Sequence, residues 1–344
     1  MRVESALSPI CATPILPNIL PFCAHYQGIK LAEAPLADFQ QLIAIQSGLQ
    51  TVVEKQGDLS LSHTIRKSEV AVRDLTARIR FSQLDSKDAL VGQLESFSAG
   101  AQDAAEGLES LASRVGGSLD IIISMDEFAL KRLERIERDG IAFGSQMFNM
   151  MALRSTESMR LRQRQELASS FERALAFTGK QLKQLVSDAT VVLNVLRRLD
   201  KIQNTVHEII TEENNTIKNE GEELLAQLWT ILGGNRAEVA LFKENRDLLA
   251  KLFRFHNAAR DQVVNTIGQL RMLSGALSEL RDRVALPVDH GADGLIPFEV
   301  HLESLRRGVE KLEVFRIQTN DRENQQLRHM LIEPLPESQQ IGSA

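Results

Sequence analysis

The chain has little of what a compact enzyme interior commonly uses. Aromatic residues make up only 5% of its 344 residues, with one Trp and one Tyr. There are only two cysteines, Cys11 and Cys23, which is too few for a disulfide framework. An interior with so few rings has to be built from Leu, Ile, Val and Ala, as stacked helices are. These shortages favour a helical architecture.

Proline is missing from the whole middle of the chain. All nine prolines lie in residues 1–35 or 287–336. A proline inside a helix costs ~3 kcal/mol, so the proline-free span permits helix nearly throughout. We therefore predict an all-α protein with the following parts: a Pro-rich N-terminal tail over 1–35, a long-helix bundle over 36–286, a hinge over 287–297, a C-terminal helix over 298–333 and a disordered tail over 334–344.

Long uninterrupted apolar runs are also missing. The most apolar stretch, 15–23, is broken by prolines and is shorter than the ~20 residues that a membrane span needs. It also lacks the basic start and continuous apolar segment of a secretory signal. With no clear signal peptide or transmembrane segment, the sequence leaves the localisation open between cytoplasmic and membrane-associated.

Neither charge nor motifs indicate catalysis or nucleic-acid binding. The formal net charge is −6 with both signs interspersed, so we expect no nucleic acid as a partner. No phosphate-binding glycine loop and no Gly-x-Ser-x-Gly turn occurs, and the seven histidines have no metal-ligand spacing. We predict no catalytic residue, no cofactor and no metal, and hence a protein that is not an enzyme.

An unbroken seven-residue apolar repeat surrounds Gly233-Gly234-Asn235. It predicts a coiled-coil helical hairpin with arms at about 180–232 and 236–286, the glycines forming its tip. The first arm becomes polar toward the tip, which predicts a hairpin that is tight at its base and looser at its tip. One row of the second arm gives the candidate interaction residues Leu249, His256, Val263, Leu270 and Leu277.

His256 is the polar member of this apolar row. Histidine titrates near neutrality, so one interpretation is a pH-sensitive position. The other is a residue that sets the register of the hairpin, as polar seam positions commonly do. We favour the second interpretation.

The repeat also predicts helices before the hairpin. One runs over about 36–56, and the next begins near Ser62. Its apolar phase changes before the row that starts at Leu90, which predicts a bend around 82–88. We expect Gly116-Gly117 to end this second helix.

Methionines and arginines concentrate in residues 147–164, which include Met150, Met151, Arg160, Arg162 and Arg164. A Met-rich side next to arginines is typical of a surface that binds a partner helix or a membrane. Methionine filling an irregular core beside a solvated basic face is the simpler interpretation, and the one we favour.

Three segments, RVGGSLD at 114–120, LWTILGGNR at 228–236 and LRDRVALP at 280–287, resemble a group of uncharacterised predicted fungal helical and coiled-coil proteins. The resemblance covers most of residues 36–310. That group has no assigned activity, so the resemblance implies no functional residue. Some of its members have apolar segments that suggest membrane association, which this chain lacks.

These observations lead to two expectations about function. The first is a structural or interaction protein that acts by coiled-coil helix association, with a second copy or another helical protein as partner. The alternative is a helical scaffold or bundle that contacts lipid through its Met- and Arg-rich helix, 147–164.

Overall fold

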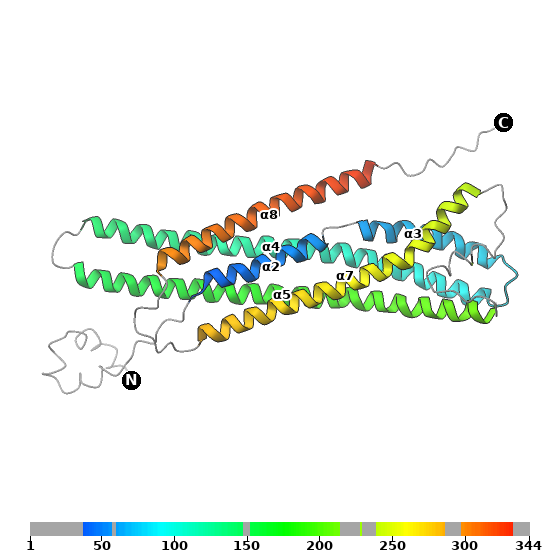
Figure 1. Ribbon diagram of the computed structural model, residues 1–344, viewed down its shortest axis with the longest axis horizontal. Helices are drawn as coiled ribbons and strands as arrows, with labels where there is room; N and C mark the ends of the chain where they lie inside the picture. The colour runs from blue at the N-terminus through cyan, green and yellow to red at the C-terminus, as the bar shows by residue number, and fades with distance from the viewer. Residues whose placement is uncertain are drawn as a thin grey trace, which may run out of the picture.

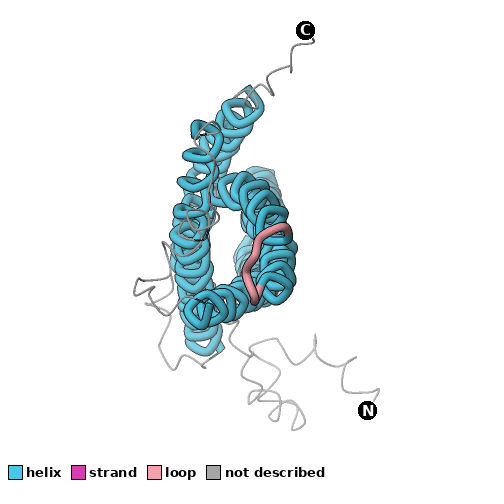
Figure 2. Tube along the Cα trace, turned by 90° about the vertical axis from the view of Figure 1, so that its right-hand side faces the viewer, coloured by secondary structure: helices cyan, strands magenta, loops and turns pink. Residues whose placement is uncertain are grey.

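The computed structural model describes residues 37–56, 60–146, 152–213, 228, 239–285 and 297–332, which contain helices and no strand. The predicted all-α class is confirmed, and the helices lie along one another in an elongated bundle (Figure 1). Seen from its end, the described residues form helices, and a short connection between two of them is drawn in pink (Figure 2). In chain order the helices are α2 (Phe39–Gln56), α3 (Ser60–Arg80), α4 (Lys87–Gln146), α5 (Ala152–Glu213), α7 (Val239–Ala285) and α8 (Phe298–Ile332).

The two longest helices of the bundle, α4 and α5, pack against each other as an antiparallel pair. These helices have 60 and 62 residues, so each is ~90 Å long at 1.5 Å per residue. Gly100 of α4 faces Leu199, and Gly107 faces Val192, so one heptad on α4 matches one heptad on α5. Far along the pair, Arg132 still meets Glu166 at 2.6 Å. The register therefore holds over most of the length of both helices.

A tight turn separates α3 from α4, where the change of apolar phase predicted a bend. Helix α3 ends at Arg80, and Phe81 N and Ser82 N donate hydrogen bonds to the carbonyls of Arg78 and Ile79. The two helices then run antiparallel, and Arg66 of α3 forms a bidentate pair with Glu109 of α4 at 2.8 and 3.0 Å. The interruption therefore lies where the bend was predicted, but it is a full reversal between two separate helices and not a bend within one helix.

The predicted helix end at Gly116-Gly117 is wrong, because α4 runs through both glycines. A helix-interior glycine costs ~1 kcal/mol, and the tertiary contacts along α4 outweigh that cost. Gly116 provides space instead of a break. A Cβ at this position would stand 2.9 Å from Nη2 of Arg316, which reaches across from α8.

The predicted hairpin is formed by α5 and α7, which pack antiparallel. Gly179 of α5 faces Leu277 of α7, and Asp200 of α5 contacts His256 of α7 at 2.7 Å. The first arm is longer than predicted, since α5 is continuous from Ala152. Residues 214–227 and 229–238, with the Gly233-Gly234-Asn235 tip, lie outside the described part of the chain.

The short helix α2 lies in the middle of the bundle and contacts α4, α5, α7 and α8. Asp38 caps it, since its Oδ1 accepts a hydrogen bond from Gln41 N at 3.0 Å. Phe39, Leu42 and Val52 are fully buried, and burying each side chain of this size contributes ~1.5–3 kcal/mol. A helix of 18 residues therefore joins four others through one apolar face.

Helix α8 packs antiparallel along α4 and also contacts α2. Its buried row is Leu302, Leu305, Val309 and Leu312. The side chain of Ile43 on α2 packs directly against the backbone of Gly308, where a Cβ would stand 2.5 Å from Cγ2 of Ile43. The C-terminal part of α8 leaves the bundle (Figure 1). The hinge predicted at 287–297 lies almost entirely outside the described residues, as do the two predicted tails.

Candidate functional site

The predicted seam row of the second hairpin arm lies inside the bundle. Its members are buried in contacts made within this one chain, and none has more than 5% of its surface exposed: Leu249, His256, Val263, Leu270 and Leu277. The sequence left open whether this row packs within the chain or between chains. The structure places it within the chain, against the rest of the bundle.

The Met- and Arg-rich segment is only partly described. Met150 and Met151 lie outside the described residues, and Arg160 belongs to the first turns of α5. Arg162 and Arg164 are exposed. Two of the five predicted residues are thus accessible to a partner.

His256 takes part in a polar contact between α7 and α5. Its Nε2 lies 2.7 Å from Oδ1 of Asp200, and Nη1 of Arg260 donates to Oδ2 of the same carboxylate at 3.1 Å. Burial lowers the pKa of His256, although Asp200 opposes this effect. The neutral ring therefore donates its Nε2 proton to Asp200, whose carboxyl group lies between the histidine and the arginine.

A catalytic histidine of the Ser-His-Asp kind has a nucleophile on its second nitrogen. Nδ1 of His256 is buried and has no hydrogen-bond partner among the described residues. The observed contacts are those of the register-setting interpretation, because they fix one turn of α7 against one turn of α5.

A second buried polar cluster joins α2, α4 and α5. Nε2 of Gln46 donates to Oδ1 of Asp126 at 3.3 Å and to Oγ1 of Thr178 at 3.1 Å. Asp126 has none of its surface exposed, and burial raises the pKa of its carboxyl to about 7. At neutral pH this residue is therefore partly protonated, which is unusual for an aspartate.

Sequence reasoning missed Asp126, although the signal was present. The buried row of α4 continues with spacings of three and four through Leu119, Ile122, Asp126, Ala129 and Leu133. Asp126 is the only one of these five residues with an ionisable side chain. A carboxyl at a seam position is a candidate for a perturbed pKa, and the rule that found His256 applies to it equally.

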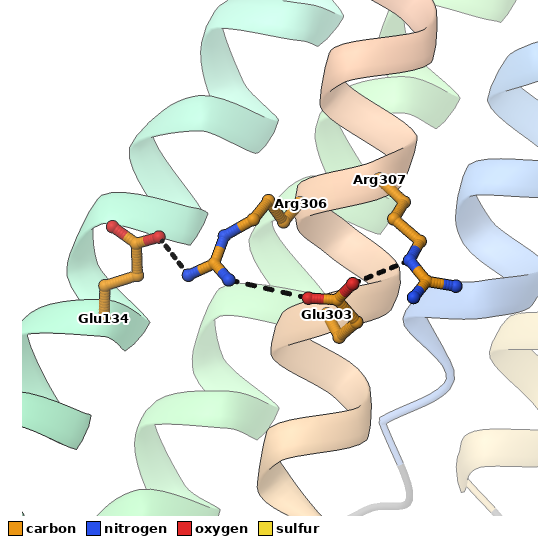
Figure 3. A network of polar contacts seen from close by, with 4 residues as sticks. All are labelled: Glu134, Glu303, Arg306 and Arg307. Atoms are coloured by element: carbon orange, nitrogen blue, oxygen red, sulfur yellow. Dashed lines mark hydrogen bonds and ion pairs between the residues drawn. The ribbon is translucent and has the colours of Figure 1, made fainter.

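An outer charged network links α4 to α8. Arg306 of α8 pairs with Glu134 of α4 at 2.8 Å and with Glu303 at 3.5 Å, and Glu303 also accepts a bond from Arg307 at 2.6 Å (Figure 3). These groups are at least partly exposed, so each pair stabilises the contact only slightly. Together they line one edge of the contact between the two helices.

Two glutamates meet on the same side of the bundle. Glu313 of α8 bonds Glu127 of α4, and this bond raises the pKa of Glu313. Glu127 also bonds Lys131, which lowers the pKa of Glu127. The contact therefore shifts the pKa values of the two glutamates in opposite directions.

Large apolar side chains are exposed next to these charges. Ile121 and Phe128 lie one heptad apart on α4, and Val314 and Ile317 lie three residues apart on α8, with 45–62% of their surfaces exposed. The bidentate contact of Asp120 with Arg316, at 2.6 and 3.0 Å, brings the two sets to the same level of the bundle. We name these four residues the α4/α8 face.

A shallow hollow of about 490 Å³ lies between α3 and α4. Its charged groups already bind one another, since Arg73 contacts Glu69 and Arg80 contacts Glu95. Phe81 at its rim is 85% exposed. The hollow offers a single apolar anchor and charges that are satisfied within the chain.

No protein-family model matches the chain, and no curated protein matches it. The resemblance to fungal helical proteins therefore remains a prediction. Among the described residues, no helix has both the length and the apolar character needed to cross a membrane.

Proposed function

We propose that the protein is a non-enzymatic structural protein that associates with a second copy of itself through the α4/α8 face. The observation that carries this proposal is the exposure of Ile121, Phe128, Val314 and Ile317 at one level of two adjacent helices. Side chains spaced by three and seven residues on a helix are the anchors that a partner helix contacts.

The charges around the α4/α8 face support a second copy as the partner. A two-fold interface brings the same patch of both copies together, so it has to be complementary to itself. The edge carries both signs, with Arg307 76% exposed and Glu303 44% exposed. An apolar centre with a polar rim is the usual composition of such an interface.

Multi-angle light scattering over a range of protein concentrations tests this proposal. We expect the wild-type chain to reach the mass of a dimer and the double variant F128S/I317S to remain a monomer. The double variant V191S/V264S removes exposed apolar side chains from α5 and α7 and serves as the matched control. A wild-type monomer at every concentration, or equal dissociation of both variants, would overturn the proposal.

Membrane contact through α5 is the competing function, and the exposure of Arg162 and Arg164 favours it. Exposed arginines attract anionic headgroups at low ionic strength. Flotation with vesicles rich in phosphatidylserine distinguishes the two functions. Binding that R160E/R162E/R164E abolishes would support the membrane function, and absence of flotation would exclude it.

A further inference from the structure

The buried junction of Gln46, Asp126 and Thr178 has more acceptors than donors when Asp126 is ionised. Nε2 of Gln46 is the donor to both Asp126 Oδ1 and Thr178 Oγ1. Oδ2 of Asp126 and Oε1 of Gln46 are buried, and neither has a hydrogen-bond partner among the described residues. Protonation of Asp126 adds the missing donor to the junction.

The helices around Asp126 present no countercharge to it. Facing its carboxyl, α2 contributes the amide of Gln46 and α5 contributes the hydroxyl of Thr178. On α4 itself, the neighbouring Glu127 binds Lys131 and Glu313 of α8. Burial raises the Asp126 pKa, the Gln46 hydrogen bond opposes this rise, and no charged group of the described helices, α7 and α8 included, contributes.

We propose that this junction is a pH-sensitive latch that holds α2 in the bundle while Asp126 is protonated and loosens α2 when Asp126 ionises. Helix α2 is the element that moves, because α4 and α5 are held to each other along their long antiparallel contact without it. A short helix that the rest of the fold does not need for its own pairing can open at a lower free energy than the fold as a whole, and α2 has 18 residues against 60 and 62 in α4 and α5. Release of α2 uncovers the surfaces of α7 and α8 that it joins.

The direction of the pH dependence follows from linkage. With α2 in place the Asp126 pKa is about 7, whereas an aspartate exposed to water has a pKa of ~4. The opening equilibrium of α2 therefore rises by about tenfold per pH unit between those two values and levels off above the higher one.

The buried histidine of α8 acts in the opposite direction. His301 lies against Phe39 of α2, with ring centroids 6.4 Å apart, and burial lowers its pKa while Asp38 opposes this effect. Its protonation on acidification favours the open state, so a latch governed by His301 would open as the pH falls. The sign of the pH dependence thus separates Asp126 from His301.

Amide hydrogen exchange of the full-length chain tests the latch. Exchange of α2 peptides is measured between pH 5 and 8.5 and divided by the intrinsic rate at each pH. We expect α2 protection to fall about tenfold per unit up to pH 7 and then to level off, while protection in the paired part of α4 and α5 stays constant. D126N should remove this dependence, because its amide does not ionise.

D103N is the matched control, since Asp103 is an exposed carboxyl on the same helix. It should retain the wild-type dependence. The wild-type slope tests the latch even when D126N fails to fold. The inference is overturned by α2 protection that is independent of pH, that rises with pH, or that keeps its slope in folded D126N.

Discussion

Arg316 of α8 covers Gly116 of α4 and binds Asp120 one helical turn further along, at 2.6 and 3.0 Å. The missing side chain at Gly116 is what lets the guanidinium reach this position. The sequence predicted that Gly116 ends a helix. In the structure Gly116 instead leaves room for an arginine from a distant part of the chain.

The two adjacent glycines should respond differently to alanine. G117A should raise the free energy of unfolding by ~1 kcal/mol, because alanine is the better helix former and a Cβ at Gly117 would meet nothing within 4 Å. G116A should gain less or be destabilising, since its Cβ displaces Arg316. Urea denaturation measures the free energy of unfolding of both variants. An equal increase in the two would contradict the packing of Arg316 over Gly116.

Gly308 should tolerate no side chain where α8 crosses α2. Its Cβ would lie 2.5–2.8 Å from three carbon atoms of Ile43, so G308A should lower the free energy of unfolding by ~1–3 kcal/mol. G275A, at an exposed position of α7 with nothing within 4 Å, is the control and should stabilise slightly. Thermal denaturation that ranks the two variants the other way would disprove this close approach.

The ion pairs between α4 and α8 should differ in strength. D120N removes the bidentate partner of Arg316, whose side chain is only 15% exposed, and should cost ~1–2 kcal/mol. E134Q removes a partner of Arg306, whose side chain is 50% exposed, and should cost less than ~0.5 kcal/mol. The denaturant midpoints of the two variants, compared at low and high salt, check this order.

Acidification should remove the stabilising effect of His256. Burial lowers its pKa in the folded state, so the unfolded chain binds the proton more readily, and stability is lost as the pH falls below ~6.5. H256Q cannot take up that proton. The stability advantage of wild type over H256Q should therefore shrink between pH 7.5 and 5, and a constant difference would show that His256 does not titrate on unfolding.

The sequence predicted the helices well because their causes are local. The lack of proline over 36–286 and the phase change before Leu90 act within a few residues. The burial of Leu249 to Leu277 at heptad spacing follows from the same periodicity.

The repeat could not predict which helices pack together. A seven-residue period says that a row is buried but does not identify the helix that covers it, so the long α4/α5 pair was missed and only α5/α7 was found. The contact at Gly116 depends on Arg316, which is 200 residues away, and no local sequence pattern contains both residues. Asp126 differs from Gly116, because the sequence itself shows that Asp126 belongs to a buried row. The sequence does not show that its partners are the neutral side chains of Gln46 and Thr178.

The constant register of α4 against α5 also makes the length of the molecule an adjustable quantity. Removal of one residue from either helix turns everything beyond it by ~100°, which would rotate a buried row into water. Seven residues added to both helices at facing points, such as beside Gly107 and Val192, keep the other α4/α5 pairs aligned. Such a change lengthens the α4/α5 pair by ~10 Å, so the distance between its ends is set by counting heptads.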